Sequence, residues 1–76
     1  MKLIVREEDG TSFVFDGLDM IGFIAPEGES LVAYFEPEGD SASRPVTAGE
    51  FEECLSAIAK AAGHNEYTYE IEEGGA

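Results

Sequence analysis

The chain has 76 residues, the length of one small domain, and we expect residues 1–76 to fold as a single compact unit. Its 17 acidic residues against four basic ones give a formal net charge of -13 at pH 7. A hydrophobic content of 43% excludes an intrinsically disordered chain despite this charge. The acidity argues against direct binding to nucleic acid or to anionic membranes, because both are bound through Lys and Arg.

No targeting or cross-linking signal is evident. No apolar run approaches the roughly 20 residues that cross a bilayer. The N-terminal segment turns acidic at Glu7 and Glu8, too early for a secretory signal, so a cytoplasmic location is expected. The single cysteine, Cys54, excludes an internal disulfide and a cysteine-based zinc site.

Two alternating segments open the chain around a turn that contains Asp9 and Gly10. Two registers are possible for this hairpin. A two-residue loop pairs Val5 with Val14, whereas a three-residue loop with a bulge at Gly10 pairs Val5 with Phe13. The second register keeps the large side chains on one face, so we prefer it. The two strands are expected at residues 2–6 and 12–16.

Two further strands are predicted at 20–25 and 31–36, joined by the five-residue loop 26–30. An irregular stretch follows, and Thr47 then begins the predicted helix as the first residue of a capping box with Glu50. Val46 and Phe51 occupy the positions of a hydrophobic staple. The helix stops at Gly63, and its apolar residues recur every three or four positions: Phe51, Cys54, Leu55, Ile58, Ala59 and Ala62.

Strict alternation predicts a last strand at 66–72, and residues 73–76 are expected to be a frayed tail. The predicted fold class is α+β, an antiparallel sheet of four to five strands with one packed helix, in the order ββββαβ. One helix covers one face of such a sheet. The reverse face would carry five hydrophobic residues, which strand curvature tucks into the core or which form a partner or dimer interface: Ile4, Val14, Ile24, Val32 and Tyr34.

We expect no enzymatic activity and no cofactor. His64, the single imidazole, follows the residue that ends the helix, where a capping role accounts for it. Cys54 lies on the apolar stripe of the helix, without a neighbouring base that would activate a thiolate. The acidic loops do not match the twelve-residue calcium loop, so no metal site is predicted.

The carboxylates are the pattern that remains. Glu70 and Glu72 alternate on one strand face, where they would form a short row of negative charge about 6.6 Å apart. Such rows can imitate a phosphate backbone toward a basic groove. The candidate acidic contacts are Glu27, Glu29, Glu38, Asp40, Glu70 and Glu72, and the aromatic anchors beside them are Tyr34, Tyr67 and Tyr69.

In size, charge and lack of catalytic residues, the chain looks like the small acidic inhibitors that phages and mobile elements make against host nucleic-acid machinery, including DNA-mimic and anti-CRISPR proteins. The resemblance rests on these general features and carries over no functional residue. It implies a non-enzymatic inhibitor, in the host-cell cytoplasm, that docks on a basic nucleic-acid-binding protein or complex.

Two other interpretations stay open. The chain would also suit a small structural or adaptor module, dimerised through the reverse face of the sheet. A halophile's housekeeping domain would carry such acidity for environmental reasons.

Overall fold

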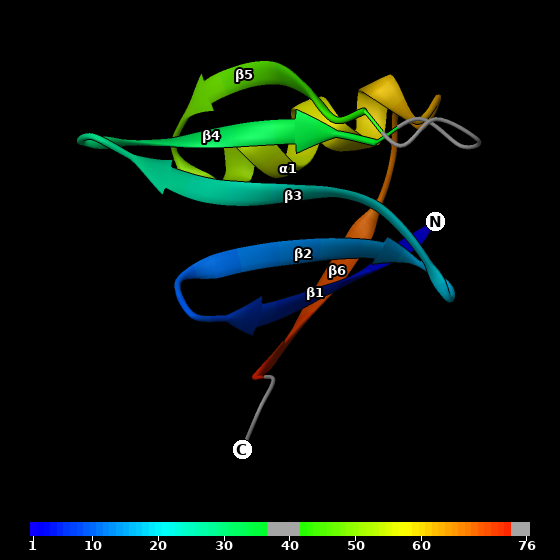
Figure 1. Ribbon diagram of the computed structural model, residues 1–76. Helices are drawn as coiled ribbons and strands as arrows, with labels where there is room; N and C mark the ends of the chain where they lie inside the picture. Colours follow the sequence, from blue (N-terminus) through cyan, green and yellow to red (C-terminus); the bar gives the residue numbers. More distant parts are fainter. Residues whose placement is uncertain (37–41, 74–76) are drawn as a thin grey trace.

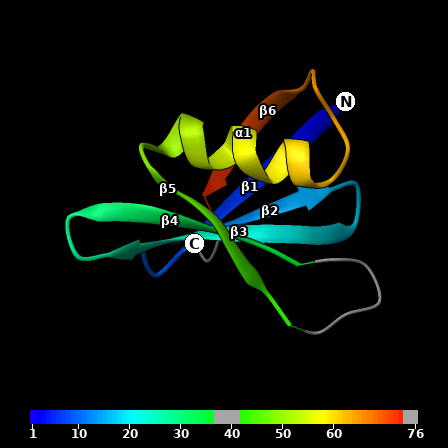
Figure 2. The ribbon, with the colours of Figure 1, turned by 90° about the horizontal axis from the view of Figure 1, so that it is seen from above.

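The computed structural model describes residues 1–36 and 42–73 of the chain. Six strands and one helix form a sheet with the helix packed on one side of it (Figures 1 and 2). In chain order, the elements are β1 Lys2–Glu8, β2 Thr11–Asp16, β3 Asp19–Glu27, β4 Ser30–Phe35, β5 Arg44–Gly49, α1 Phe51–Ala61 and β6 Thr68–Glu73.

The predicted α+β class is confirmed, but the sheet has six strands instead of four or five and is mixed instead of antiparallel. Its strand order is β5-β4-β3-β2-β1-β6. β1 to β5 pair antiparallel with their neighbours, whereas β6 pairs parallel with β1. A parallel pair needs a long crossover. The chain between β1 and β6 contains all the other elements, and this non-local pairing leaves no signal in the sequence.

The first hairpin uses the register that we did not prefer. Val5 pairs with Val14, and the connection is the two-residue turn Asp9–Gly10. Asp9 has φ 50° and Gly10 has φ 83°, and two consecutive residues with positive φ define the type I′ turn that matches the twist of paired strands. The β3–β4 connection is also tighter than predicted, because β3 extends to Glu27 and pairs there with Ser30.

β5 was missed in the sequence. Pro45 and the polar residues around it suggested an irregular stretch, yet residues 44–49 pair antiparallel with β4. Thr47 therefore belongs to a strand and is not the N-cap. Glu50 occupies the N-cap position without a side-chain cap hydrogen bond, so the predicted capping box and its staple are wrong.

The predicted end of α1 is confirmed. Gly63 has φ 91°, a conformation that glycine adopts at little cost. Its amide donates to the Lys60 carbonyl oxygen, and the His64 amide donates to the Ala59 carbonyl oxygen, at 2.9 Å each. These two bonds form the Schellman motif that closes many helices at a glycine.

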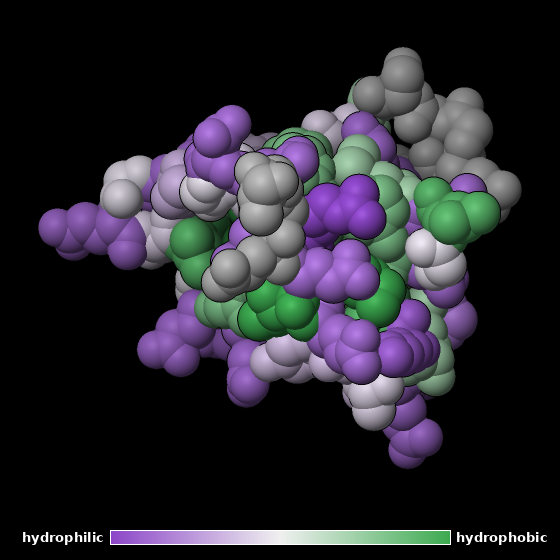
Figure 3. Space-filling view, turned by 90° about the horizontal axis from the view of Figure 1, so that it is seen from below, coloured by the Kyte–Doolittle hydropathy of each residue, from purple (hydrophilic) through white to green (hydrophobic). Residues whose placement is uncertain are grey.

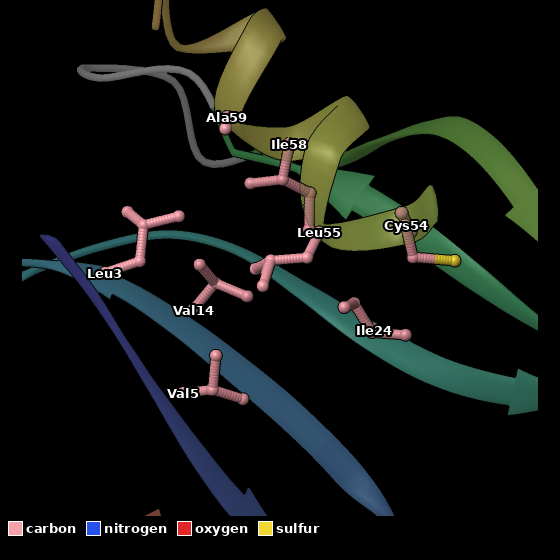
Figure 4. Packing of buried hydrophobic residues seen from close by; sticks show 9 residues of the cluster. Leu3, Val5, Val14, Ile24, Cys54, Leu55, Ile58 and Ala59 are labelled. Atoms are coloured by element: carbon pink, nitrogen blue, oxygen red, sulfur yellow. The ribbon is translucent and has the colours of Figure 1, made fainter. Parts of the chain in front are cut away.

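The core lies between α1 and the side of the sheet that faces it (Figure 4). The apolar stripe of α1 is confirmed as the buried side of the helix. Val14 and Ile24, predicted on the reverse face, are fully buried in this core because the observed registers turn them toward the helix. The buried residues are Leu3, Val5, Val14, Ile24, Ala33, Cys54, Leu55, Ile58 and Ala59.

Gly22 allows α1 to approach the sheet closely. A Cβ at this position would overlap the Tyr34 carbonyl oxygen and lie 3.1 Å from Ile58 Cγ2. The helix is therefore seated where β3 has no side chain.

Gly22→Ala should lower the free energy of unfolding by about 1–3 kcal/mol, the range for overpacking a core. Urea unfolding followed by circular dichroism measures it. Gly28→Ala is the control, since a Cβ there meets no atom within 4 Å and the loss comes from its φ of 64° alone. A Gly22→Ala chain as stable as the parent would contradict the seating of α1 on β3.

Candidate partner-binding surface

α1 contacts β3, β4 and β5 on one side of the sheet, and no described element covers the other side. Figure 2 shows the helix on a single side of the strands. We call the other side the uncovered face. Several apolar side chains on it are partly buried, because they pack against one another instead of against a second layer: Ile4, Phe13, Phe15, Phe23, Val32 and Tyr34.

Three aromatic rings cross the middle of the uncovered face, and we call them the aromatic row: Phe13, Phe23 and Tyr34. They occupy paired positions on β2, β3 and β4. The Phe23 and Tyr34 rings stack with centroids 4.8 Å apart and an interplanar angle of 16°. Phe13 and Phe23 are tilted, with centroids 6.3 Å apart. Such pairs add stability beyond their buried area and hold the rings in fixed positions.

Two bases on β1 continue this surface toward β6. Arg6 pairs in register with Phe13 and with Glu72, and its guanidinium lies 5.3 Å from the centroid of the Phe15 ring. Arg6 Nη2 is 3.6 Å from Glu72 Oε1, and Lys2 Nζ is 2.9 Å from Glu70 Oε1. Glu70 and Glu72 lie on one face of β6, as predicted, and β1 supplies a cation to each of the two carboxylates.

Most of the described carboxylates outside these two ion pairs lie at one end of the sheet. The turns Asp9–Gly10 and Gly28–Glu29 lie at this end, together with the start of α1 (Figure 1), and we call it the turn end. Its carboxylates are Glu7, Glu8, Asp9, Glu27, Glu29, Glu50, Glu52 and Glu53. Lys2, Arg44 and Lys60 lie toward the opposite end, since each is at the start of a strand or in the last turn of α1.

Glu27 connects the turn end to the aromatic row, because the Tyr34 hydroxyl donates a hydrogen bond to its carboxylate. This hydrogen bond raises the pKa of Tyr34 above the ordinary value of 10.0, and desolvation and the Glu27 charge act in the same direction. Tyr34 therefore presents a neutral phenol whose hydroxyl is fixed in orientation. Glu29 lies exposed in the same turn, and Glu38 and Asp40 lie outside the described residues.

The other two predicted aromatic anchors face the helix side. Tyr69 packs against the core, with its ring centroid 5.9 Å from that of Phe51 and its hydroxyl 3.3 Å from Glu52 Oε1. Tyr67 packs beside it, with ring centroids 6.5 Å apart. Burial, followed by the charge of Glu52, raises the pKa of Tyr69. Tyr34 is thus separated from Tyr67 and Tyr69 by the thickness of the sheet.

Figure 3 shows the molecule from the side of β1 and β6, where hydrophilic side chains cover most of the margin and hydrophobic ones lie between them. On β6, Ile71 is 50% exposed, although it pairs with the buried Val5. The exposure arises because α1 covers β3 to β5 and does not extend over this edge.

The side chains that could take part in catalysis or metal binding were located next. Cys54 is fully buried, and burial raises the pKa of its thiol, which lies 3.6 Å from the Leu31 carbonyl oxygen. Within residues 1–36 and 42–73, no three His, Cys, Asp or Glu side chains are placed to hold a metal ion. An open hollow of about 530 Å³ beside α1 is lined by residues that include Glu52, Lys60 and Tyr67. No side-chain polar atom in the described part of the chain is buried without a hydrogen-bond partner.

The sequence reasoning missed Phe13, Phe23 and Arg6 as surface residues. The register preferred for the first hairpin assigned Phe13 to the helix side, and the predicted pairing of 20–25 with 31–36 assigned Phe23 to that side. An available signal was the Asp-Gly pair itself, which is the strongest short-range indication of a two-residue turn.

Comparison of the chain with protein-family models, with curated proteins and with solved structures found no match. In the described residues, no helix has the length and apolarity that a membrane crossing requires. The surface must therefore be interpreted from its own geometry and charge.

Glu27→Gln should lower the pKa of Tyr34 toward 10, because the carboxylate that accepts its hydrogen bond and repels the phenolate is removed. In the parent, a raised folded-state pKa means that this contribution to stability is complete below pH 10 and is lost as the pH rises through the folded-state value. Ultraviolet titration of the phenolate measures the shift. Glu29→Gln is the control, and an equal shift in both variants would contradict the assignment.

Proposed function

We propose that the chain is a non-enzymatic binding protein that docks on a basic surface of a partner protein through its uncovered face and turn end. The observation that carries the proposal is the juxtaposition of the aromatic row with the carboxylates of the turn end, connected by the Tyr34–Glu27 hydrogen bond. Aromatic side chains held in fixed positions are effective interface anchors, and clustered charge directs the encounter.

The distribution of charge supports a basic partner. The basic residues that form ion pairs, Lys2 and Arg6, are on β1, and their partners, Glu70 and Glu72, are on β6. The turn end contains eight carboxylates outside these pairs, and their mutual repulsion lowers stability. A cationic surface would relieve this repulsion on binding. A nucleic-acid-binding protein or complex offers such a surface, and occupying it would inhibit the complex in the cytoplasm of a host cell.

The test is retention of partners by a tagged chain from a bacterial lysate, with elution by rising salt and identification by mass spectrometry. We expect a basic nucleic-acid-binding protein that salt releases and that DNA or RNA displaces. Charge reversal of Glu8, Glu27 and Glu29 to Lys should weaken its retention at least about fivefold at roughly 0.15 M salt.

The matched control reverses Asp16, Asp19 and Glu66, which lie toward the opposite end of the sheet, and changes the net charge by the same amount. Retention should then fall much less than in the turn-end variant. Equal losses in the two triple variants would show that only total charge matters and would contradict docking at the turn end. Unchanged binding in both would remove the electrostatic part of the proposal.

The uncovered face also favours a second candidate, a structural or adaptor module that forms a homodimer. Of the five residues predicted for that interface, Ile4, Val32 and Tyr34 lie on the uncovered face, whereas Val14 and Ile24 are in the core. Ile4 and Val32 are partly buried and lack a covering layer, which is typical of association sites.

For this second candidate, Val32→Asp should convert a dimer to a folded monomer, because it places a charge in the middle of an apolar contact. Sedimentation equilibrium measures the mass, and circular dichroism confirms that the variant is folded. Ile71→Asp is the control, since Ile71 is already 50% exposed and pairs with Val5 on the helix side of the sheet. A parent that is monomeric at high protein concentration would exclude the homodimer.

A further inference from the structure

The two edges of the sheet differ in their ability to accept another strand. β5 forms one edge and β6 the other. β5 contains Pro45, which has no N–H to donate, and its pairing with β4 is interrupted by a register shift. Prolines and bulges are devices that block pairing at an edge. β6 contains neither, and it keeps a continuous register with β1 from Thr68 to Glu73.

The backbone of β6 is oriented for such pairing. The Thr68 amide donates to the Met1 carbonyl oxygen at 2.8 Å, so the backbone N–H and C=O groups of Thr68 point to β1. Because successive strand residues alternate, Glu70 and Glu72 also direct their backbone groups to β1, whereas Tyr69 and Ile71 direct theirs to the open edge. An added strand would find these N–H and C=O groups in place. Beside them lies the half-exposed Ile71 side chain.

We propose that the β6 edge binds an extended basic segment of the partner protein as a seventh strand of the sheet. The inference rests on the proposed function and gives its binding mode. A row of unpaired backbone groups supplies hydrogen bonds, and alternate side-chain positions supply specificity. Glu70 and Glu72 project on the uncovered-face side of this edge. In their ion pairs with Lys2 and Arg6 their side chains stay 60% and 49% exposed, so cationic side chains of the added strand would still approach them. Ile71 would receive an apolar side chain on the other side.

The negative charge of the chain favours a basic strand over a second copy of the chain at the β6 edge. Pairing β6 with β6 of another molecule would bring the same carboxylates together, and two chains of net charge -13 repel each other. Lys2 and Arg6 offset Glu70 and Glu72 locally, so it is the net charge of -13 that opposes self-association through this edge and favours a strand that contains Lys or Arg.

The probe is a six-residue peptide of alternating Lys and Val, added to the isotope-labelled full chain and followed by NMR amide hydrogen exchange. We expect slower exchange of the Ile71 and Tyr69 amides, which face the open edge. A peptide with one central Val replaced by Pro has nearly the same charge distribution and cannot form a regular strand. It should bind at least about fivefold more weakly.

Two substitutions at Ile71 distinguish the contribution of its backbone N–H to peptide binding from that of its side chain. Ile71→Pro removes the N–H that faces the open edge and leaves the ladder with β1 intact, as proline is tolerated on a free strand edge. Ile71→Ala shortens the side chain and retains the N–H. We expect Ile71→Pro to lose about fivefold more affinity for the Lys-Val peptide than Ile71→Ala. The exchange measurement on the parent does not depend on how well either variant folds.

Peptide binding that slows exchange at Ile71 and depends on its N–H supports the edge mode. Salt-dependent binding that shifts the Phe23 and Tyr34 resonances, with no protection on β6, overturns it and leaves the basic-partner proposal standing. Failure of the Lys-Val peptide to bind, while the tagged chain still retains a basic protein, also overturns the edge mode alone. Failure of both experiments overturns both proposals.

Discussion

The two-residue turn at Asp9–Gly10 is the constraint on which the other features of the molecule depend. Because side chains alternate along a strand, a shift of one residue in this hairpin would exchange the two faces of β1 relative to β2. The type I′ geometry fixes Val5 opposite Val14, and both side chains then point to α1. Phe13 is directed to the other side by the same pairing. Phe13 thus joins Phe23 and Tyr34 in the aromatic row because of the turn that sets the register of β1 and β2.

A single helix of 11 residues is the second constraint. It spans about 16 Å and cannot cover a sheet of six strands. The backbone of α1 lies over β3 to β5 and is brought close by Gly22, while Leu3, Val5 and Val14 of β1 and β2 are buried in the same core. β6 is attached by the ion pairs of Lys2 and Arg6 and by the contact of Tyr69 with Phe51 of α1. The surfaces that we propose for binding are the face of the sheet opposite α1 and the free edge of β6.

The sequence contained the signals that act locally and lacked those that act at a distance. The apolar stripe of α1 and its end at Gly63 were predicted because the repeat and the terminating glycine lie within one segment. The N-cap was wrong because Thr47 and Glu50 have the capping-box spacing, while pairing of residues 44–49 with β4 prevails over it. The ion pairs of Glu70 and Glu72 were missed for a similar reason: their cations, Lys2 and Arg6, come from β1, at the other end of the chain. Of the predicted contacts, Glu27 and Tyr34 are brought together, and Tyr67 and Tyr69 are placed on the other side of the sheet.

The proposal of a basic partner rests on the uneven distribution of charge. An acidity that served only solubility or a saline environment would need no particular location. In this chain, the bases on β1 form ion pairs with carboxylates of the edge strand, whereas the carboxylates of the turn end share one end of the sheet outside these pairs. Like charge gathered in one region costs stability. A small domain has little stability to spare, so the proposed partner would offset this cost on binding. A cationic surface that contacts the turn end would do so, and it would meet the aromatic row on the same approach because Tyr34 and Glu27 are bonded to each other.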